Sequence, residues 1–229
     1  MKNIFFEKPT EILHGRLLTS VNFVSDEDLS GKKILDIGCG YGWCEINFLK
    51  RGVKKISAIE ISENDLTTIR QNVKDERLEL KEGSAIKLPF PDGSFDTIVS
   101  WEVIEHIHQN TESVMFKEVY RVLKPNGHFY LSTPHRSFFA NILDPAWWLI
   151  GHRHYSVENL YKFAQKSNFR IVETKIFGSW WTLVSTLDLY IAKWLFRRSR
   201  FFNNFLSKKE SEEYSASGFV NIFMKLKKV

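Results

Sequence analysis

The sequence predicts an α/β fold built on a doubly wound, mostly parallel sheet. Short apolar runs alternate with longer helical patterns from Lys33 to about Lys175, as in strand–helix–strand crossover units. Gly38, Gly40 and Gly42 directly follow the first apolar run. After roughly forty residues that do not look like sheet, one more strand pattern closes the chain at 218–228. We therefore expect seven strands, the last of them antiparallel.

The elements follow in order along the chain. We expect strands at 33–37, 56–61, 78–81, 95–101, 127–132 and 170–176, with the seventh, 218–228, paired antiparallel to 170–176. Helices are expected near 42–51, 63–74, 111–123 and 157–167. The turn at 124–127 separates the third helix from the fifth strand, because Pro125 cannot continue a helix and Asn-Gly tolerates positive φ.

Length and composition fit a single domain with two insertions. A chain of 229 residues with 43% hydrophobic content can bury the core of one α/β domain. We expect one domain over 1–229, with its core at about 31–176 plus 218–228 and insertions at 134–155 and 178–215. The two cysteines lie five residues apart, which indicates neither a disulfide framework nor a zinc site, and the first residues lack a secretory apolar core. A cytoplasmic setting is expected.

The net charge of +5 comes from the C-terminal end. Residues 1–192 hold 23 basic and 24 acidic side chains, whereas residues 193–229 hold nine basic and three acidic ones. Outside the tail there is no excess of positive charge that would follow a phosphate backbone, so a nucleic-acid partner is disfavoured.

The turn at 36–42 suits the close approach of a nucleotide. Missing side chains let the backbone bend sharply, and the next helix presents free N–H groups. A dinucleotide fingerprint needs a third glycine where Trp43 stands, so an NAD-dependent oxidoreductase is disfavoured. Glu60, 22 residues after Gly38, ends the second strand, where a carboxylate can accept both ribose hydroxyls beside an apolar Ile61. The other interpretation of the turn is a tight structural corner.

At these residues the sequence resembles the class I S-adenosylmethionine-dependent methyltransferases. The first motif of that family is similar to 35–42, and Glu60 matches its acidic ribose ligand. Segment 88–99 followed by 102–106 looks like the loop and strand that come next, and 121–127 like the helix end before the fifth strand. The resemblance implies a Rossmann-like seven-stranded fold, S-adenosylmethionine as cofactor and S-adenosylhomocysteine as product.

The resemblance also implies roles for individual residues. Those implied around the methionine part of the cofactor are Asp36, Gly38, Cys39 and Gly40, with Glu60 at the ribose and Ile61 on the adenine face. Gly83, Ser84 and Ala85 would lie at the adenine edge, where the family often has aspartate in place of Ser84. Ser100 and Trp101 are expected near the sulfonium. Arg16 either pairs with the carboxylate of the cofactor or is a solvated helix residue.

Methyl transfer needs alignment and exclusion of water more than a nucleophilic side chain. A general base helps only where the acceptor loses a proton, as a hydroxyl does. Several histidines fall in loops expected at the carboxyl ends of strands, where open α/β sheets bind ligands. The preferred substrate-side residues are His135, His152, His154 and Tyr155, although a structural or solvated histidine remains the alternative. No metal is expected, because no acidic cluster accompanies the His-x-His pairs in the sequence.

Five of the seven tryptophans fall between Trp147 and Trp194, in the two insertions. We expect the first insertion to form a lid. The second contains 180–196, a helical pattern with one apolar stripe, followed by basic residues up to Lys209. At 17 residues with two charges it is a poor transmembrane candidate. It is either a helix packed on the domain as a substrate cap or a contact with an anionic membrane, and both hold if the substrate is lipophilic.

The leading hypothesis is methyl transfer from S-adenosylmethionine to a small or lipid-linked acceptor, at oxygen. Carbon and nitrogen acceptors are the alternatives within that class. A membrane-associated protein that binds the cofactor without turnover is the alternative outside it. The oligomeric state is not predicted.

Overall fold

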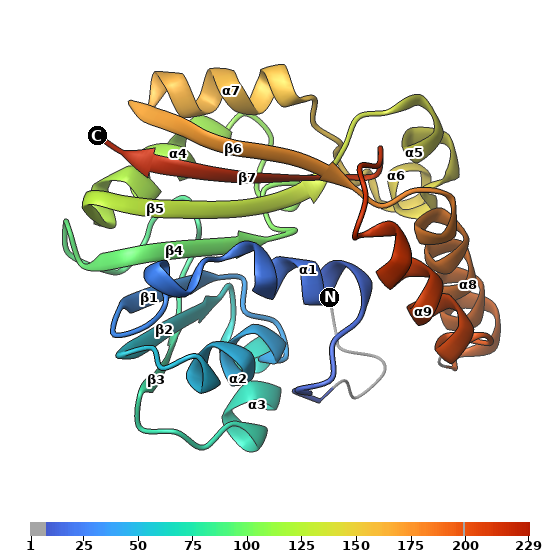
Figure 1. The fold of residues 1–229 in the computed structure, drawn as a ribbon, viewed down its shortest axis with the longest axis horizontal. Coiled ribbons are helices and arrows are strands. Elements are labelled where there is room, and N and C mark those ends of the chain that lie inside the picture. Colours follow the sequence, from blue (N-terminus) through green and yellow to red (C-terminus); the bar gives the residue numbers. More distant parts are fainter. Residues whose placement is uncertain (1–7, 199) are drawn as a thin grey trace.

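The centre of the molecule is a seven-stranded sheet of order β3-β2-β1-β4-β5-β7-β6 (Figure 1). The computed structural model describes residues 8–198 and 200–229. The first five strands pair in parallel, whereas β7 runs antiparallel to both β5 and β6. The α/β class and the antiparallel last strand are therefore confirmed. The strands are β1 Lys33–Ile37, β2 Lys55–Glu60, β3 Leu78–Glu82, β4 Phe95–Trp101, β5 Leu123–Pro134, β6 Phe169–Phe177 and β7 Asn221–Lys228.

Helices cover both faces of the sheet and bury a hydrophobic cluster on each. On one face lie α1 (Gly15–Phe23), α2 (Trp43–Lys50) and α3 (Glu63–Asn72), with Phe48 and Leu66 in the core. On the other lie α4 (Glu112–Val122) and α7 (Val157–Lys166), with Phe116 and Leu160 in the core. Neighbouring residues of β1 point to opposite faces, as the twofold period of a strand requires, so Ile34 joins one cluster and Leu35 the other.

The bounds of the predicted elements differ from the observed ones by a few residues. The largest difference is at β5, which begins at Leu123 and not near Gly127. Leu123 pairs with Phe95, and the register then shifts before Thr97 pairs with His128. The intervening bulge holds Asn126 at a φ of +63°, so the expected turn is present inside the strand. The short 3-10 turn at Asp26–Asp28 and helix α1 were not among the predicted elements.

The two insertions form one group of helices beyond the carboxyl ends of β4 and β5 (Figure 1). The first holds α5 (Phe138–Leu143) and α6 (Pro145–Ile150), and the second holds α8 (Trp180–Phe196) and α9 (Asn203–Glu213). Helix α8 contacts α5, α6 and α9, and α9 contacts α1. Within the described residues, no helix has the length and apolar character needed to cross a membrane.

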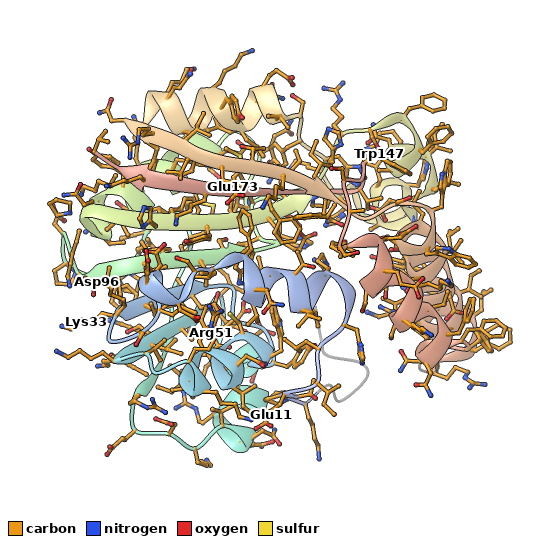
Figure 2. The ribbon with its side chains drawn as sticks, viewed as in Figure 1. Glu11, Lys33, Arg51, Asp96, Trp147 and Glu173 are labelled. Carbon is orange, nitrogen blue, oxygen red and sulfur yellow. The ribbon has the colours of Figure 1, made fainter. Side chains whose placement is uncertain are left out.

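At the other end of the sheet, where β1 and β4 begin, hydrogen bonds and an ion pair join surface residues. There the Asp96 carboxylate accepts a hydrogen bond from the Lys33 amide at 2.9 Å and pairs with Lys124 at 2.7 Å. Figure 2 shows Lys33 and Asp96 at this end and Trp147 at the other. The candidate site lies on the side of Trp147, where the parallel strands end.

Candidate active site

Two glycines of the turn after β1 have different surroundings, since Gly38 packs against Val103 and Gly40 borders open space. Gly38 has a φ of +80°, and a Cβ atom there would meet Val103 at 2.5 Å, so only glycine fits against the loop that follows β4. Gly40 has a φ of +55°, but a Cβ atom there would meet no atom within 4 Å. The backbone at Gly40 therefore faces free space, as a ligand-approach turn requires.

Glu60 ties this turn to the end of β2. One carboxylate oxygen accepts a hydrogen bond from the Gly40 amide at 2.7 Å, and burial raises the pKa of the side chain. The Gly83 amide donates to the Glu60 carbonyl at 2.8 Å, so that loop lies beside the same strand end. The neighbouring Ile61 is 66% exposed and offers a bare apolar surface. The fold thus brings together the residues predicted for the ribose and the adenine.

Asp36 is a buried acid beside the glycine turn. It is 1% exposed, and neither carboxylate oxygen has a hydrogen-bond partner by distance and angle in the described part of the chain. Burial raises its pKa to about 7, and burial likewise raises the pKa of Glu45, which lies beside it. The side chains of Glu45 and Cys44 interact with Asp36, but no salt bridge joins it to a cation among the described residues. Ionising a buried acid in such surroundings is costly, and a cationic ligand group would compensate for that cost.

Four other predicted cofactor residues have side chains that are buried or already make a polar contact. Ser100 and Trp101 are 1% and 6% exposed, and the Trp101 ring packs on Phe223 at 6.1 Å between centroids. Their predicted contact with the sulfonium is therefore available only to the main chain. Arg16 pairs with Glu102, at 2.9 Å between Nη1 and Oε2. The Ser84 hydroxyl accepts a long hydrogen bond from the Ile86 amide at 3.4 Å, and the residue is half-buried.

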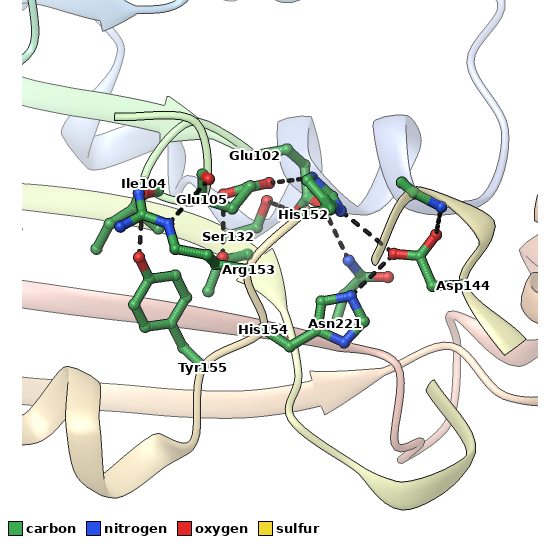
Figure 3. Close-up of polar contacts among 12 residues, drawn as sticks. Glu102, Ile104, Glu105, Ser132, Asp144, His152, Arg153, His154, Tyr155 and Asn221 are labelled. Carbon is green, nitrogen blue, oxygen red and sulfur yellow. Dashed lines mark hydrogen bonds and ion pairs between the residues drawn. The ribbon is translucent and has the colours of Figure 1, made fainter. Parts of the chain in front are cut away.

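Two glutamates, Glu102 and Glu105, lie in the loop that follows β4. Glu102 accepts hydrogen bonds from Ser132 at 2.6 Å and Asn221 at 3.1 Å, so it joins the ends of β5 and β7 (Figure 3). Glu105 accepts from Thr133 at 3.0 Å through one oxygen, and the other oxygen has no hydrogen-bond partner among the described residues. Burial, and then the charge of Glu102, raise the pKa of Glu105 well above its usual range.

His152 lies between this glutamate and Asp144. Its Nδ1 is 3.2 Å from Asp144 Oδ2, and its Nε2 is 3.7 Å from the unpartnered oxygen of Glu105 (Figure 3). Burial alone would raise the pKa of Asp144, but hydrogen bonds from His152 and His154 hold it well below its usual range. Asp144 is therefore ionised, and we assign the Nδ1 proton of His152 to the bond with it. This tautomer leaves the lone pair on Nε2.

The other predicted substrate-side residues are differently placed. Both nitrogens of His154 meet acceptors, Asn141 Oδ1 at 2.7 Å and Asp144 Oδ2 at 2.9 Å. His135 contacts the Phe219 carbonyl at 3.1 Å and is not part of this carboxylate–histidine cluster. Tyr155 is 5% exposed, and its hydroxyl lies 3.0 Å from Glu112 and 3.1 Å from the Ile104 carbonyl. Burial raises the pKa of Tyr155, so its hydroxyl keeps its proton. Because that hydroxyl already contacts two acceptors, the geometry favours a positioning role for Tyr155.

Arg153 joins the first insertion to the loop that follows β4, and the sequence analysis did not select it as a site residue. Its guanidinium donates to the carbonyls of Ile104, Glu105 and Ile107 and pairs with Glu112 at 2.6 Å. These bonds fasten the end of the first insertion to the loop that carries Glu105. The one feature that could have pointed to Arg153 is its place between two histidines. Its partners are main-chain carbonyls, which any residue type supplies, so the sequence does not reveal them.

The fold also supplies acids to the histidines. Two groups of donor atoms lie within 4.8 Å of one another: Glu105, His106 and His152 form one, and Asp144, His152 and His154 the other. The sequence had indicated no acidic cluster at these histidines, and this expectation was wrong because the acids come from the β4–α4 loop and the first insertion. In the second group, hydrogen bonds already occupy both nitrogens of His154.

The sheet order, the glycine turn and the acidic end of β2 define a class I methyltransferase domain. A family described as a methyltransferase domain matches residues 10–174, and the chain belongs to that family. Its cofactor, S-adenosylmethionine, fits the residues present, because open space lies before Gly40 and the unpartnered Asp36 carboxyl suits a cationic group.

Relatives agree with this assignment. The chain is 27% identical over 145 residues to a protein of Mycolicibacterium smegmatis named as a probable S-adenosylmethionine-dependent methyltransferase, covering 63% of this chain and 54% of that one. A fatty-acid O-methyltransferase of the same organism is 32% identical over 104 residues, covering 44% and 37%. The chain thus spans about half the length, or less, of these relatives. A crystal structure of an S-adenosylmethionine-dependent methyltransferase from Mesorhizobium loti shares the fold, with a TM-score of 0.61, 19% identity and 87% and 92% coverage.

Proposed function

We propose that the protein transfers the methyl group of S-adenosylmethionine to a hydroxyl oxygen of a small or lipid-linked acceptor. The observation that carries this proposal is His152, whose Nδ1 faces an ionised Asp144 and whose Nε2 faces the unpartnered oxygen of Glu105. A base of this kind is useful for a hydroxyl acceptor, which must lose a proton, and less so for an acceptor with a free lone pair.

The loop that carries Glu105 borders the turn that would hold the methyl donor. Val103 fills the space in front of Gly38, and Glu105 and His106 follow it within three residues. When bound, the cofactor supplies a methyl group already activated by its sulfonium. Asp36 and the Gly40 backbone would hold its methionine part, Glu60 its ribose and Ile61 its adenine, as the family resemblance implies.

The chain itself then has to position the acceptor and move one proton. Asp144 orients the His152 ring, and His152 Nε2 takes the hydroxyl proton as the oxygen–carbon bond forms and the carbon–sulfur bond breaks. The products are the methylated oxygen and S-adenosylhomocysteine. A positive charge on the ring would favour the ionised form of Glu105, 3.7 Å away, against the burial and the Glu102 charge that raise its pKa. Arg153 and Tyr155 hold the first insertion against the β4–α4 loop, which keeps His152 and Glu105 in place for this step.

The experiment follows methyl-labelled S-adenosylmethionine into extracted small-molecule and lipid pools and identifies the bond formed. We expect label in a methyl ether or ester, and turnover lowered by about 10²- to 10⁴-fold in His152→Gln with S-adenosylhomocysteine binding retained. His108→Gln, an exposed histidine of the β4–α4 loop, is the matched control and should keep full turnover. Label on nitrogen or carbon, or an active His152→Gln, would overturn the proposal. Binding of S-adenosylhomocysteine without any transfer would favour the cofactor-binding alternative.

A further inference from the structure

Helix α8 presents its apolar stripe to the solvent. A helix docked on a domain normally buries its apolar side. The buried side chains of α8 are Thr182, Leu183, Ser185 and Ala192, of which only Leu183 belongs to the stripe. Of the stripe, Trp180, Val184, Ile191, Trp194 and Leu195 are between 43% and 74% exposed. The helix therefore faces the protein with its less apolar side.

This stripe belongs to a larger apolar surface. The first insertion adds Phe139, whose ring lies 4.8 Å from that of Trp180, and Trp148, which is 64% exposed. Beyond the end of α8, Phe202 is 66% exposed. We call the exposed apolar side chains of α5, α6, α8 and the α8–α9 connection the aromatic face. Several exposed apolar side chains on neighbouring helices are typical of a contact with a partner or a membrane.

Positive charge accompanies the aromatic face. From Trp180 to Lys209 the only acid is Asp188, which accepts hydrogen bonds from the Phe201 and Phe202 amides. The exposed Arg197 and Arg198 end α8, and the Arg198 guanidinium lies 4.7 Å from the Phe201 ring. The basic residues of this segment are Lys193, Arg197, Arg198, Arg200, Lys208 and Lys209. Arg200 and Lys209 pair with Glu210 and Glu212 of α9, so a contact with anionic lipid would rest on Arg197 and Arg198. Exposed aromatic side chains next to such cations are features of a helix that lies in an anionic lipid interface.

The aromatic face is also next to the site. Helix α8 packs against α6, the helix that Asp144 caps, and the charge of Asp144 adds to the effect of burial in raising the pKa of Tyr190 on α8. Asp144 caps α6 by accepting a hydrogen bond from the Ala146 amide at 2.9 Å. Trp180, which belongs to the aromatic face, lies on the same helix as Tyr190. One side of the inserted helices thus meets the proposed base, and the other side is the aromatic face.

We propose that the aromatic face docks on the surface of an anionic bilayer, from which the site receives a lipid-linked acceptor. The substrate class rests on the function proposed above, but the docking does not. Apolar side chains enter the interface, and Arg197 and Arg198 meet anionic headgroups. Docked in this way, α5, α6 and α8 separate the site from water and bring it to the membrane.

Flotation of the full chain with vesicles tests this proposal. The probes are phosphatidylcholine vesicles alone and phosphatidylcholine vesicles with about one third phosphatidylglycerol. We expect the protein to float with the anionic vesicles and to remain below with the neutral ones at physiological salt. Trp194→Ala with Leu195→Ala should abolish flotation, and Arg197→Glu with Arg198→Glu should weaken it at least 25-fold, about fivefold for each cation lost.

Matched controls carry the same changes elsewhere. Val114→Ala with Val172→Ala removes exposed apolar atoms from α4 and β6, and Lys162→Glu with Lys166→Glu reverses two exposed charges on α7. Both should float as the unaltered protein does. All variants are checked for folding by S-adenosylhomocysteine binding, which separates loss of docking from loss of the proposed function.

Three outcomes would overturn the docking proposal. They are no flotation of the unaltered protein, equal flotation of the Trp194→Ala, Leu195→Ala variant, and equal loss in the control variants. A dimer in solution that this variant disrupts, without flotation of the unaltered protein, would instead assign the aromatic face to a second copy of the chain.

Discussion

Replacing Asp36 with asparagine should stabilise the protein while it weakens the cofactor site. The carboxyl is fully buried beside Glu45, and its pKa is raised to about 7 from an ordinary value of 3.8. A carboxyl with a raised pKa stabilises the fold fully below pH 3.8, and this contribution is lost as the pH rises through 7. Asparagine has almost the same shape and never carries the buried charge.

The magnitude follows from the shift in pKa. About three units at about 1.36 kcal/mol each set an upper limit of about 4 kcal/mol above pH 7. Relaxation around the buried pair reduces this, so we expect the free energy of unfolding to rise by about 2 kcal/mol at pH 8. For a chain of this size that corresponds to about 4–8 °C in Tm. The gain should shrink toward pH 5, where Asp36 is already protonated in the folded protein.

The assay is thermal unfolding of the cofactor-free protein at pH 5 and pH 8, together with calorimetric binding of S-adenosylhomocysteine. Asp96→Asn is the control of opposite sign, because a Lys124 ion pair and the Lys33 amide overcome burial and lower the pKa of Asp96. It should destabilise the protein at pH 8 and leave binding unchanged. A fall in Tm of Asp36→Asn at pH 8, or undiminished binding, would refute the reasoning about this buried acid.

Three further outcomes test other parts of the site. Gly40→Ala should abolish S-adenosylhomocysteine binding, whereas Gly93→Ala, with a similar positive φ and the same open surroundings at the far end of β4, should cost the same backbone strain of about 1 kcal/mol and bind normally. Arg153→Ala should lower the free energy of unfolding in chemical denaturation by about 2–4 kcal/mol, because buried Glu112 loses its ion-pair partner, although it keeps the hydrogen bond from Tyr155, and Arg153→Lys should recover part of the loss. Removal of divalent cations with EDTA should leave turnover unchanged, because His152 works with Asp144; activity lost and restored by one added cation would assign the His–carboxylate groups to a metal.

Local patterns were sufficient to predict the core of the fold. The apolar runs at β1 and β4 are buried almost throughout, so their bounds could be read without error. Gly40 and Glu60 were also predictable, because a turn after one strand and an acid ending the next must meet at one edge of a parallel sheet.

The remainder of the site depends on contacts between distant segments. His152 was a candidate from the sequence, but only the fold shows Asp144 on one side of it and Glu105 on the other. Its neighbour His154 looks equivalent in the sequence and differs because Asn141 occupies its second nitrogen. The periodicity of α8 likewise revealed an apolar stripe but not the direction it faces, since the side chains that the fold buries are Thr182, Leu183, Ser185 and Ala192.

The central claim is that the turn at Gly40 and the end of β2 at Glu60 hold the methyl donor. The most direct test is a calorimetric titration of the full chain and of Glu60→Gln with S-adenosylhomocysteine. Glutamine keeps the size of the side chain and an acceptor for the Gly40 amide but loses the charge that accepts ribose hydroxyls. The account predicts one binding event per chain, weakened at least tenfold in Glu60→Gln. No binding by the unaltered protein, or equal binding by both, would contradict it.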